Sequence, residues 1–289
     1  MACNENTIKD KNEIISSGIN SIMNRFSGQG NMVARIQEEL RELVELEIKY
    51  GFLSSIGLKI LFDCNLHNHN QIEGFIKAPE NSPYKNGIFH FVIKYPDNYP
   101  ENPPSIFFKT KILHFEVRES DGYCCLSLFF SREKEYHLYQ IIGIIYDLFV
   151  NLNPMDAYQN EATRLFKEDP SLFYKKCEEY VEIYAGKEFN NKLEYVFQDI
   201  YAPKFNESKD DLLFVSLIGK PKEIRMKKSK IHDDMYIGEL INKLSETMCE
   251  RFQKEEFIIG NKVYHRYNNE KFINNQIIFI IPNLYKYCS

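Results

Sequence analysis

The sequence predicts an α+β protein: a helix, a four-stranded antiparallel meander and trailing helices, followed by a smaller α+β unit. Three patterns lead to this prediction. Apolar residues recur with helical spacing at 31–49 and again from residue 138, short β-prone runs fill the region between, and a hairpin signal followed by one helix lies beyond residue 210. With 289 residues, 44% of them hydrophobic, the chain is long enough for a full core; its length fits one large domain or two smaller ones, and we expect two.

The first domain is predicted to begin with a helix at about 31–49. Its apolar face carries Met32, Val33, Ile36, Leu40, Leu43 and Val44. Its polar face carries Glu38, Glu39, Arg41 and Glu42. The preceding residues 1–30 are mostly polar and end in Ser27-Gly28-Gln29-Gly30, so we expect them to form a flexible N-terminal extension.

Turn-forming residues separate four strand-like segments in the middle of the chain. These segments are 58–64, 71–76, 88–95 and 106–108. The proline-rich stretch 95–104 is predicted to be irregular, because proline fixes φ and lacks a backbone donor, and irregular chain is also expected to about Leu126. Helical spacing returns at 138–152, 160–167 and 171–184, which completes a first domain over residues 31–186.

The character of the chain changes after residue 186. A helix at 189–200 and a polar linker are expected within 187–210, and a C-terminal domain within 211–289. In that domain a hairpin over 212–228 is predicted to precede a helix at 237–252 and short strands at 257–259, 262–264 and 276–281. This is the order of elements in a β-grasp fold.

Composition excludes several classes of function. The net charge of -5 comes from interspersed acids and bases, so no general attraction to nucleic acid or anionic membrane is expected. No run reaches the roughly 18 apolar residues that span a bilayer, and we expect a soluble protein of the cytoplasm, the nucleus or both. The seven cysteines form no CxxC pair, which argues against a disulfide framework and a zinc site. No metal or other cofactor is expected.

A series of strand and turn motifs lies between residues 82 and 156. The segments are Ser82-Pro83-Tyr84-Lys85-Asn86-Gly87-Ile88-Phe89, Tyr95-Pro96 through Tyr99-Pro100 with Pro103-Pro104, Phe108 to His114, Asp121-Gly122-Tyr123-Cys124-Cys125-Leu126, and Asn153-Pro154-Met155-Asp156. In this order they resemble the ubiquitin-conjugating enzyme family: the start of a strand, the YPxxPP turn, the strand before the HPN motif, the catalytic-cysteine turn and the NPxD segment. The resemblance covers about residues 31–185 and implies the UBC fold for the first domain.

The resemblance implies that Cys125 is a nucleophile. Such an enzyme accepts ubiquitin or a ubiquitin-like modifier from an activating enzyme as a cysteine thioester, and passes it to a lysine amine with the help of a ligase. A thiolate suits both steps, because it is a good nucleophile and a good leaving group. The register from Gly122 and Leu126 assigns this role to Cys125 and leaves Cys124 at an apolar position. A buried structural thiol at Cys125 stays an alternative.

Asp156 falls where the family has an acid that orients and deprotonates the incoming lysine. An Asp that caps a helix or turn after Asn153-Pro154 is the alternative.

Two departures from the family lie near this site. The HPN triplet reads His114-Phe115-Glu116, with one more residue than usual before Cys125. The family's asparagine is assigned to the oxyanion or to shaping the loop, and an ionised Glu116 would be an acceptor of the wrong sign; losing one such donor costs about 10²–10³ in rate. The resemblance implies a structural role for His114.

Partner-binding positions also depart from the family pattern. Glu101 replaces the aromatic residue common in the YPxxPP turn, and the chain contains no Trp. In the family, the aromatic residue of this turn and a Trp in the loop after the cysteine normally help to bind ligases of the RING or HECT type, so the ligase type stays open here. Arg35, in Arg35-Ile36-Gln37-Glu38, is expected to contact a partner, and this segment is similar to the neddylation-type branch, as is Ile144-Ile145-Tyr146.

Three functions remain open from the sequence: an active conjugating enzyme, a catalytically inactive variant that acts as a binding or scaffold protein, and regulation by a tail that occupies the core's own modifier surface. The tail segments 215–226 and 257–262 resemble ubiquitin, although an extension that merely packs on the core is the alternative. Because the sequence ends Tyr287-Cys288-Ser289 without Gly-Gly, we expect an interaction module and not a conjugatable modifier.

Overall fold

The computed structural model describes residues 31–61, 70–124, 136–152, 161–186, 211–217, 219, 221–231, 235–248, 256–259, 262–264, 267, 269–272 and 277–281. The expected extension at 1–30 and the expected helix at 189–200 lie outside these ranges. Within them, no helix has the length and apolar character needed to cross a membrane.

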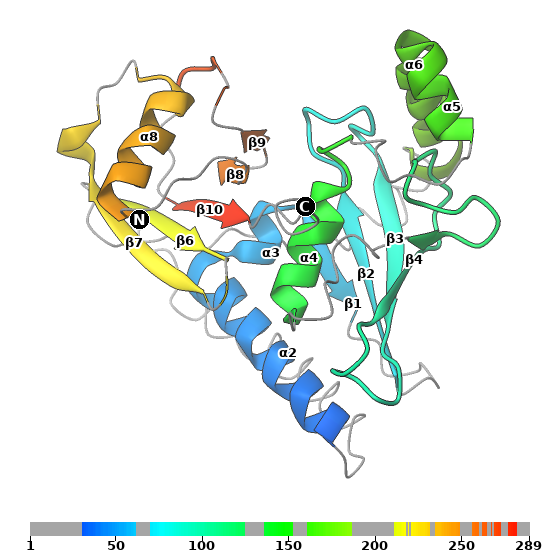
Figure 1. Ribbon diagram of the computed structural model, residues 1–289, viewed down its shortest axis with the longest axis horizontal. Helices are drawn as coiled ribbons and strands as arrows, with labels where there is room; N and C mark the ends of the chain where they lie inside the picture. The colour runs from blue at the N-terminus through cyan, green and yellow to red at the C-terminus, as the bar shows by residue number, and fades with distance from the viewer. Residues whose placement is uncertain are drawn as a thin grey trace, which may run out of the picture.

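Five antiparallel strands form the first sheet, in the order β1-β2-β3-β4-β5 (Figure 1). They are β1 (Leu58–Leu61), β2 (Gln71–Lys77), β3 (Ile88–Lys94), β4 (Ser105–Phe108) and β5 (Tyr123–Cys124). The first four make the predicted meander. The prediction of irregular chain is wrong at β5, which pairs Cys124 with Ile106 of β4. Two residues are too few to show strand alternation in a sequence.

Helix α2 (Asn31–Tyr50) forms where the first helix is predicted and leads through the short α3 (Phe52–Ser55) into β1. One residue of the predicted polar face of α2 lies inside the protein. Glu39 is fully buried and accepts hydrogen bonds from Arg35 Nε and Tyr99 Oη, so its assignment to the solvent-facing side is wrong. The proline-rich turn supplies Tyr99 over this side of the helix, and burial raises the pKa of Glu39.

Helix α4 (Leu138–Asp147) ends before the predicted limit at residue 152, and all ten of its residues are buried. The chain then turns, with Phe149 N–H donating to Tyr146 O at 3.1 Å. Helices α5 (Glu161–Glu168) and α6 (Pro170–Tyr180) follow, with a final turn at Val181–Ala185. Asp169 caps α6 by accepting from Leu172 N at 3.0 Å. Figure 1 shows α5 and α6 at the side of the first sheet away from the C-terminal unit.

The C-terminal unit contains a second five-stranded sheet, in the order β7-β6-β10-β8-β9. Its elements are β6 (Asp211–Ser216), β7 (Lys222–Lys227), a 3-10 turn (Lys228–Lys230), α8 (Ile237–Met248), β8 (Glu256–Ile259), β9 (Lys262–Tyr264) and β10 (Ile277–Ile281). The first and last strands lie together in the centre and run parallel, with Ile277 opposite Leu213. A hairpin flanks each of them, and α8 connects the two hairpins. This topology is the predicted β-grasp.

The inner strands of the second sheet, β6, β10 and β8, are buried on both faces, whereas most of the edge strand β7 is exposed. Side chains on one face pack under α8 and include Leu212, Phe214, Phe257, Ile278 and Ile280. The alternate side chains belong to the same apolar cluster as the first sheet: Leu213, Val215, Leu217, Ile258, Phe279 and Ile281. The β-grasp unit (residues 211–281) therefore shares a core with the first sheet. The domain limits drawn from the sequence stay a prediction.

Three kinds of contact join the β-grasp unit to α3 and α4. The rings of Phe52 and Phe279 lie 5.2 Å apart. Gln140 Nε2 donates to Gly219 O at 3.1 Å, and Tyr139 Oη donates to the same carbonyl. Gly143 faces Ile281 of β10, since a Cβ at this glycine would lie 3.4 Å from Ile281 Cγ2, at van der Waals contact. Figure 1 shows α4 between the first sheet and this unit.

We expect Phe279→Ala to lower the free energy of unfolding by about 3–5 kcal/mol, because the ring is 2% exposed in the shared core and its loss leaves a cavity. Denaturant unfolding followed by far-UV circular dichroism measures the change. Tyr267→Ala, at a side chain that is 82% exposed, should change it by less than about 0.5 kcal/mol. Unfolding of the β-grasp unit in a separate, earlier transition of the wild type would contradict the shared core.

Candidate active site

The loop between β4 and β5 leads to the predicted nucleophile. At its end the backbone of Gly122 adopts φ 75°, and a Cβ there would lie 1.9 Å from Phe108 O. Glycine is therefore required for the loop to return to β4, where Phe108 N donates to Gly122 O at 2.8 Å. Asp121 braces the turn by accepting from Arg118 Nε at 2.8 Å and from Tyr123 N at 3.1 Å.

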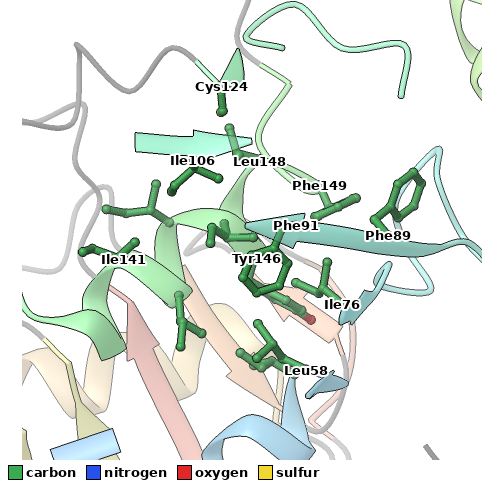
Figure 2. Close-up of a cluster of buried hydrophobic side chains, with 14 of the residues drawn as sticks. Leu58, Ile76, Phe89, Phe91, Ile106, Cys124, Ile141, Tyr146, Leu148 and Phe149 are labelled. Carbon is green, nitrogen blue, oxygen red and sulfur yellow. The ribbon is translucent and has the colours of Figure 1, made fainter. Parts of the chain in front are cut away.

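Cys124 ends the described part of this segment, on β5. Its side chain is 1% exposed and belongs to the apolar cluster that contains Ile106 and Leu148 (Figure 2). A thiol in such surroundings is inert, because ionisation is disfavoured and reagents cannot reach it. Cys125 and Asp156, the residues expected to do the chemistry, lie outside the described ranges.

His114 fixes the loop to the end of α4. Its ring is 2% exposed, and Nε2 lies 2.8 Å from Leu148 O. Nδ1 accepts from Glu116 N at 3.1 Å, so the proton of the neutral ring is on Nε2 and is donated to Leu148 O. Burial lowers the pKa of His114 from its usual 6.5 to about 4, against a smaller upward effect of the Leu148 hydrogen bond. His114 is thus neutral at physiological pH and ties two backbone segments together.

Glu116 brings a carboxyl group into the same loop. Its side chain is 2% exposed. The next residue, Val117, forms an isolated antiparallel bridge with Cys124. The loop therefore runs beside β5, and the structure brings His114, Glu116 and Cys124 together. The sequence does not reveal that this carboxyl is buried, because Glu is rarely enclosed and no apolar spacing marks the loop.

The two predicted partner-binding residues differ in exposure. Glu101 is exposed in the proline-rich turn, where its backbone N–H donates to Asn98 O at 2.9 Å. The side chain of Arg35 is 16% exposed, and its Nε lies 2.6 Å from Glu39 Oε1. Most of the Arg35 side chain is therefore engaged inside the protein, a position that helical spacing alone did not reveal.

Comparison with known proteins identifies the family of the segment that contains α2, the first sheet and the helices α4 to α6. Residues 35–181 match the family model described as ubiquitin-conjugating enzyme. The chain belongs to the ubiquitin-conjugating enzyme family. The match includes the loop with His114 and Glu116 and ends before the β-grasp unit. The similarity to the neddylation-type branch stays a prediction.

Several curated ubiquitin-conjugating enzymes are similar to the chain. Ubiquitin conjugating enzyme E2 B of Dictyostelium discoideum is 29% identical over 126 residues, which cover 42% of this chain and 85% of that protein. Ubiquitin-conjugating enzyme E2-24 kDa of Saccharomyces cerevisiae is 35% identical over 149 residues, 50% of this chain and 66% of that protein. Ubiquitin-conjugating enzyme E2 K of Homo sapiens is 26% identical over 168 residues, 56% and 81% of the two chains. These relatives support a conjugating-enzyme role.

Among the described residues, no three His, Cys, Asp or Glu side chains are grouped so that they could hold a metal ion.

We expect the neutral, buried His114 to make stability depend on pH. The unfolded chain binds a proton at this ring below pH 6.5, and the folded chain binds it only below about pH 4. The free energy of unfolding should therefore fall by about 3 kcal/mol more in the wild type than in His114→Gln as the pH falls through this window. Urea unfolding at a series of pH values measures the difference. Equal slopes in the two proteins would show that His114 is not held neutral.

Proposed function

We propose that the chain is an active conjugating enzyme that accepts ubiquitin or a ubiquitin-like modifier from an activating enzyme as a thioester on Cys125 and passes it to a lysine. Membership of the ubiquitin-conjugating enzyme family over residues 35–181 carries this proposal. The burial of Cys124 supports the choice of Cys125, since of two adjacent thiols one is enclosed in the core. Action in the cytoplasm, the nucleus or both is part of the proposal, as is a ligase partner of unspecified type.

The chemistry has two acyl transfers. The Cys125 thiolate attacks the carbonyl carbon of the activated modifier and displaces the thiolate of the activating enzyme. A lysine amine then attacks the new thioester, and the Cys125 thiolate leaves. Asp156 orients the amine and accepts its proton.

A catalytically inactive scaffold protein is the second candidate function. The observation that favours it is Glu116, a buried carboxyl at the position of the family's asparagine. The third possibility, regulation by a ubiquitin-like tail, is favoured by the packing of the β-grasp unit on α4.

A charging assay with activating enzymes and labelled modifiers separates the first two candidates. We expect a reductant-sensitive adduct on the wild type and on Cys124→Ala, and none on Cys125→Ala, because thiols cleave a thioester to Cys125 but leave an amide bond to lysine intact. An adduct lost in Cys124→Ala and kept in Cys125→Ala would reverse the assignment. No adduct with any modifier would favour the inactive scaffold.

Asp156→Asn should leave charging intact and slow discharge of the thioester to free lysine by about 10²-fold, because the amide cannot accept the amine's proton. A single-turnover chase with lysine measures this rate. Asp169→Asn, at the cap of α6, serves as the control and should discharge at the wild-type rate. If Asp156→Asn does the same, Asp156 is a turn or capping residue.

A further inference from the structure

Strand β7 is an edge of the second sheet, and its charge differs from that of the rest of the chain. The chain as a whole is acidic, with a net charge of -5, yet residues 222–230 hold five Lys or Arg and a single Glu. Among the described strands, β7 pairs only with β6, and Figure 1 shows it at the outer side of the sheet. The strand therefore combines a local excess of positive charge with an edge that no described strand covers.

The basic side chains of β7 lie on both faces of the sheet, because side chains alternate along a strand. Ile224 packs against the apolar cluster under α8, and Lys222 shares this face because it lies two residues before Ile224. Arg225 lies opposite Leu213, whose side chain belongs to the core shared with the first sheet. Lys227 is on the same face as Arg225. Since these three basic residues are exposed, positive charge flanks the edge on both faces.

The acidic residue of β7, Glu223, is engaged by helix α2. Its carboxylate accepts hydrogen bonds from Lys49 Nζ and Tyr50 Oη at the end of that helix. These bonds lower the pKa of Glu223, so it is ionised and forms an ion pair with Lys49. Arg225 Nη2 lies 3.8 Å from the other carboxylate oxygen of Glu223, and its side chain is still 50% exposed. Glu223 therefore fixes β7 to α2 and leaves a net positive charge along the edge.

An extended acidic peptide is the ligand that fits this arrangement best. A strand added to a sheet edge directs alternate side chains to both faces and places each one opposite a side chain of the edge strand. Opposite charges at such positions stabilise the pair. A membrane surface or a nucleic acid would instead meet charges gathered on one face, and the net charge of -5 opposes the approach of either polyanion.

We propose that the outer edge of β7 binds an acidic segment of a partner protein, which adds to the second sheet as an extended strand. The backbone of this segment pairs with the N–H and C=O groups that alternate residues of β7 direct away from β6. Acidic side chains of the segment lie opposite Lys222, Arg225 and Lys227. The side chain opposite Ile224 is apolar, because Ile224 is half-buried. The inference does not depend on the proposed thioester.

The test uses the full chain and a labelled peptide, Asp-Thr-Asp-Val-Thr-Asp, blocked at both ends. In antiparallel pairing its acids lie opposite Lys227, Arg225 and Lys222, and its Val lies opposite Ile224. The reversed peptide serves for parallel pairing. A peptide of the same charge with Pro in place of each Thr is the control for backbone pairing, because proline removes donors and interrupts strand pairing. Fluorescence anisotropy at low salt measures binding.

We expect Lys222→Glu and Lys227→Glu each to weaken binding at least about threefold, and the double variant about tenfold or more, because each attraction becomes a repulsion. Lys175→Glu makes the same charge change on the exposed side of α6 and should bind like the wild type. The proline peptide should bind at least about tenfold more weakly. Far-UV circular dichroism should show that all variants keep the wild-type fold.

Equal binding by the wild type and the double variant would overturn the proposal, as would equal binding of the proline peptide. Failure of both Thr-containing peptides to bind the wild type would also overturn it. The basic residues would then serve only to discourage edge-to-edge pairing between copies of the chain, as lysines on edge strands do.

Hydrogen exchange reports the state of the edge directly. In the free chain, the outward amides of β7 should exchange faster than the amides bonded to β6, and the peptide should slow them. Outward amides that are already protected in the free chain would overturn the proposal, because another segment would then cover the edge. Tighter binding of oligothymidylate or of vesicles containing phosphatidylserine, lost in the same double variant, would overturn it in favour of a partner that bears phosphate.

Discussion

The burial of α4 on every side is the constraint on which most of the structure depends. The helix contributes Ile141 and Tyr146 to the apolar cluster shown in Figure 2. It also meets the β-grasp sheet at Gly143 and Gln140. A helix with apolar side chains on all sides is stable in water only when all sides are covered, and in α4 the polar Gln140 and Asp147 are buried as well. The sequence of α4 therefore requires the second sheet as well as the first.

The candidate site takes its geometry from this buried helix. His114 donates to the carbonyl of Leu148, the residue that follows α4, and accepts from Glu116 N. On the other side of the loop, Cys124 is fixed by its pairing with Ile106 and by its place in the core. The segments that precede Cys125 are thus held by packing and by buried hydrogen bonds, and little further ordering is needed at the moment of reaction.

The sequence predicts most elements of the fold, because hydrophobic spacing and turn residues are local signals. The meander, the hairpin of the tail and α8 all follow from such signals. The parallel pairing of β6 and β10 does not, since Leu213 and Ile277 are far apart in the chain and their contact is set by tertiary packing. The burial of Glu39 was missed for a related reason: helical spacing does not show that the proline-rich turn brings Tyr99 over that face.

At the candidate site, the family resemblance predicts which residues take part, whereas only the structure shows which side chains surround them. The motif order pointed to the loop from His114 to Cys125, but no pattern of residues indicates that a carboxyl in that loop is enclosed, as it is at Glu116. Enclosure depends on which side chains the fold brings over the loop, and these come from distant parts of the chain, such as Tyr84 and Cys177.

The shared core also limits how the β-grasp unit can act. Separating it from α4 would expose the six apolar side chains that it contributes to the common cluster: Leu213, Val215, Leu217, Ile258, Phe279 and Ile281. At roughly 1.5–3 kcal/mol for each buried side chain, the loss is on the order of 10 kcal/mol. A separated state this unfavourable has a negligible population, and a ligand could open it only by binding it more tightly by a similar free energy. Any role of the β-grasp unit is therefore exerted from its docked position on α4.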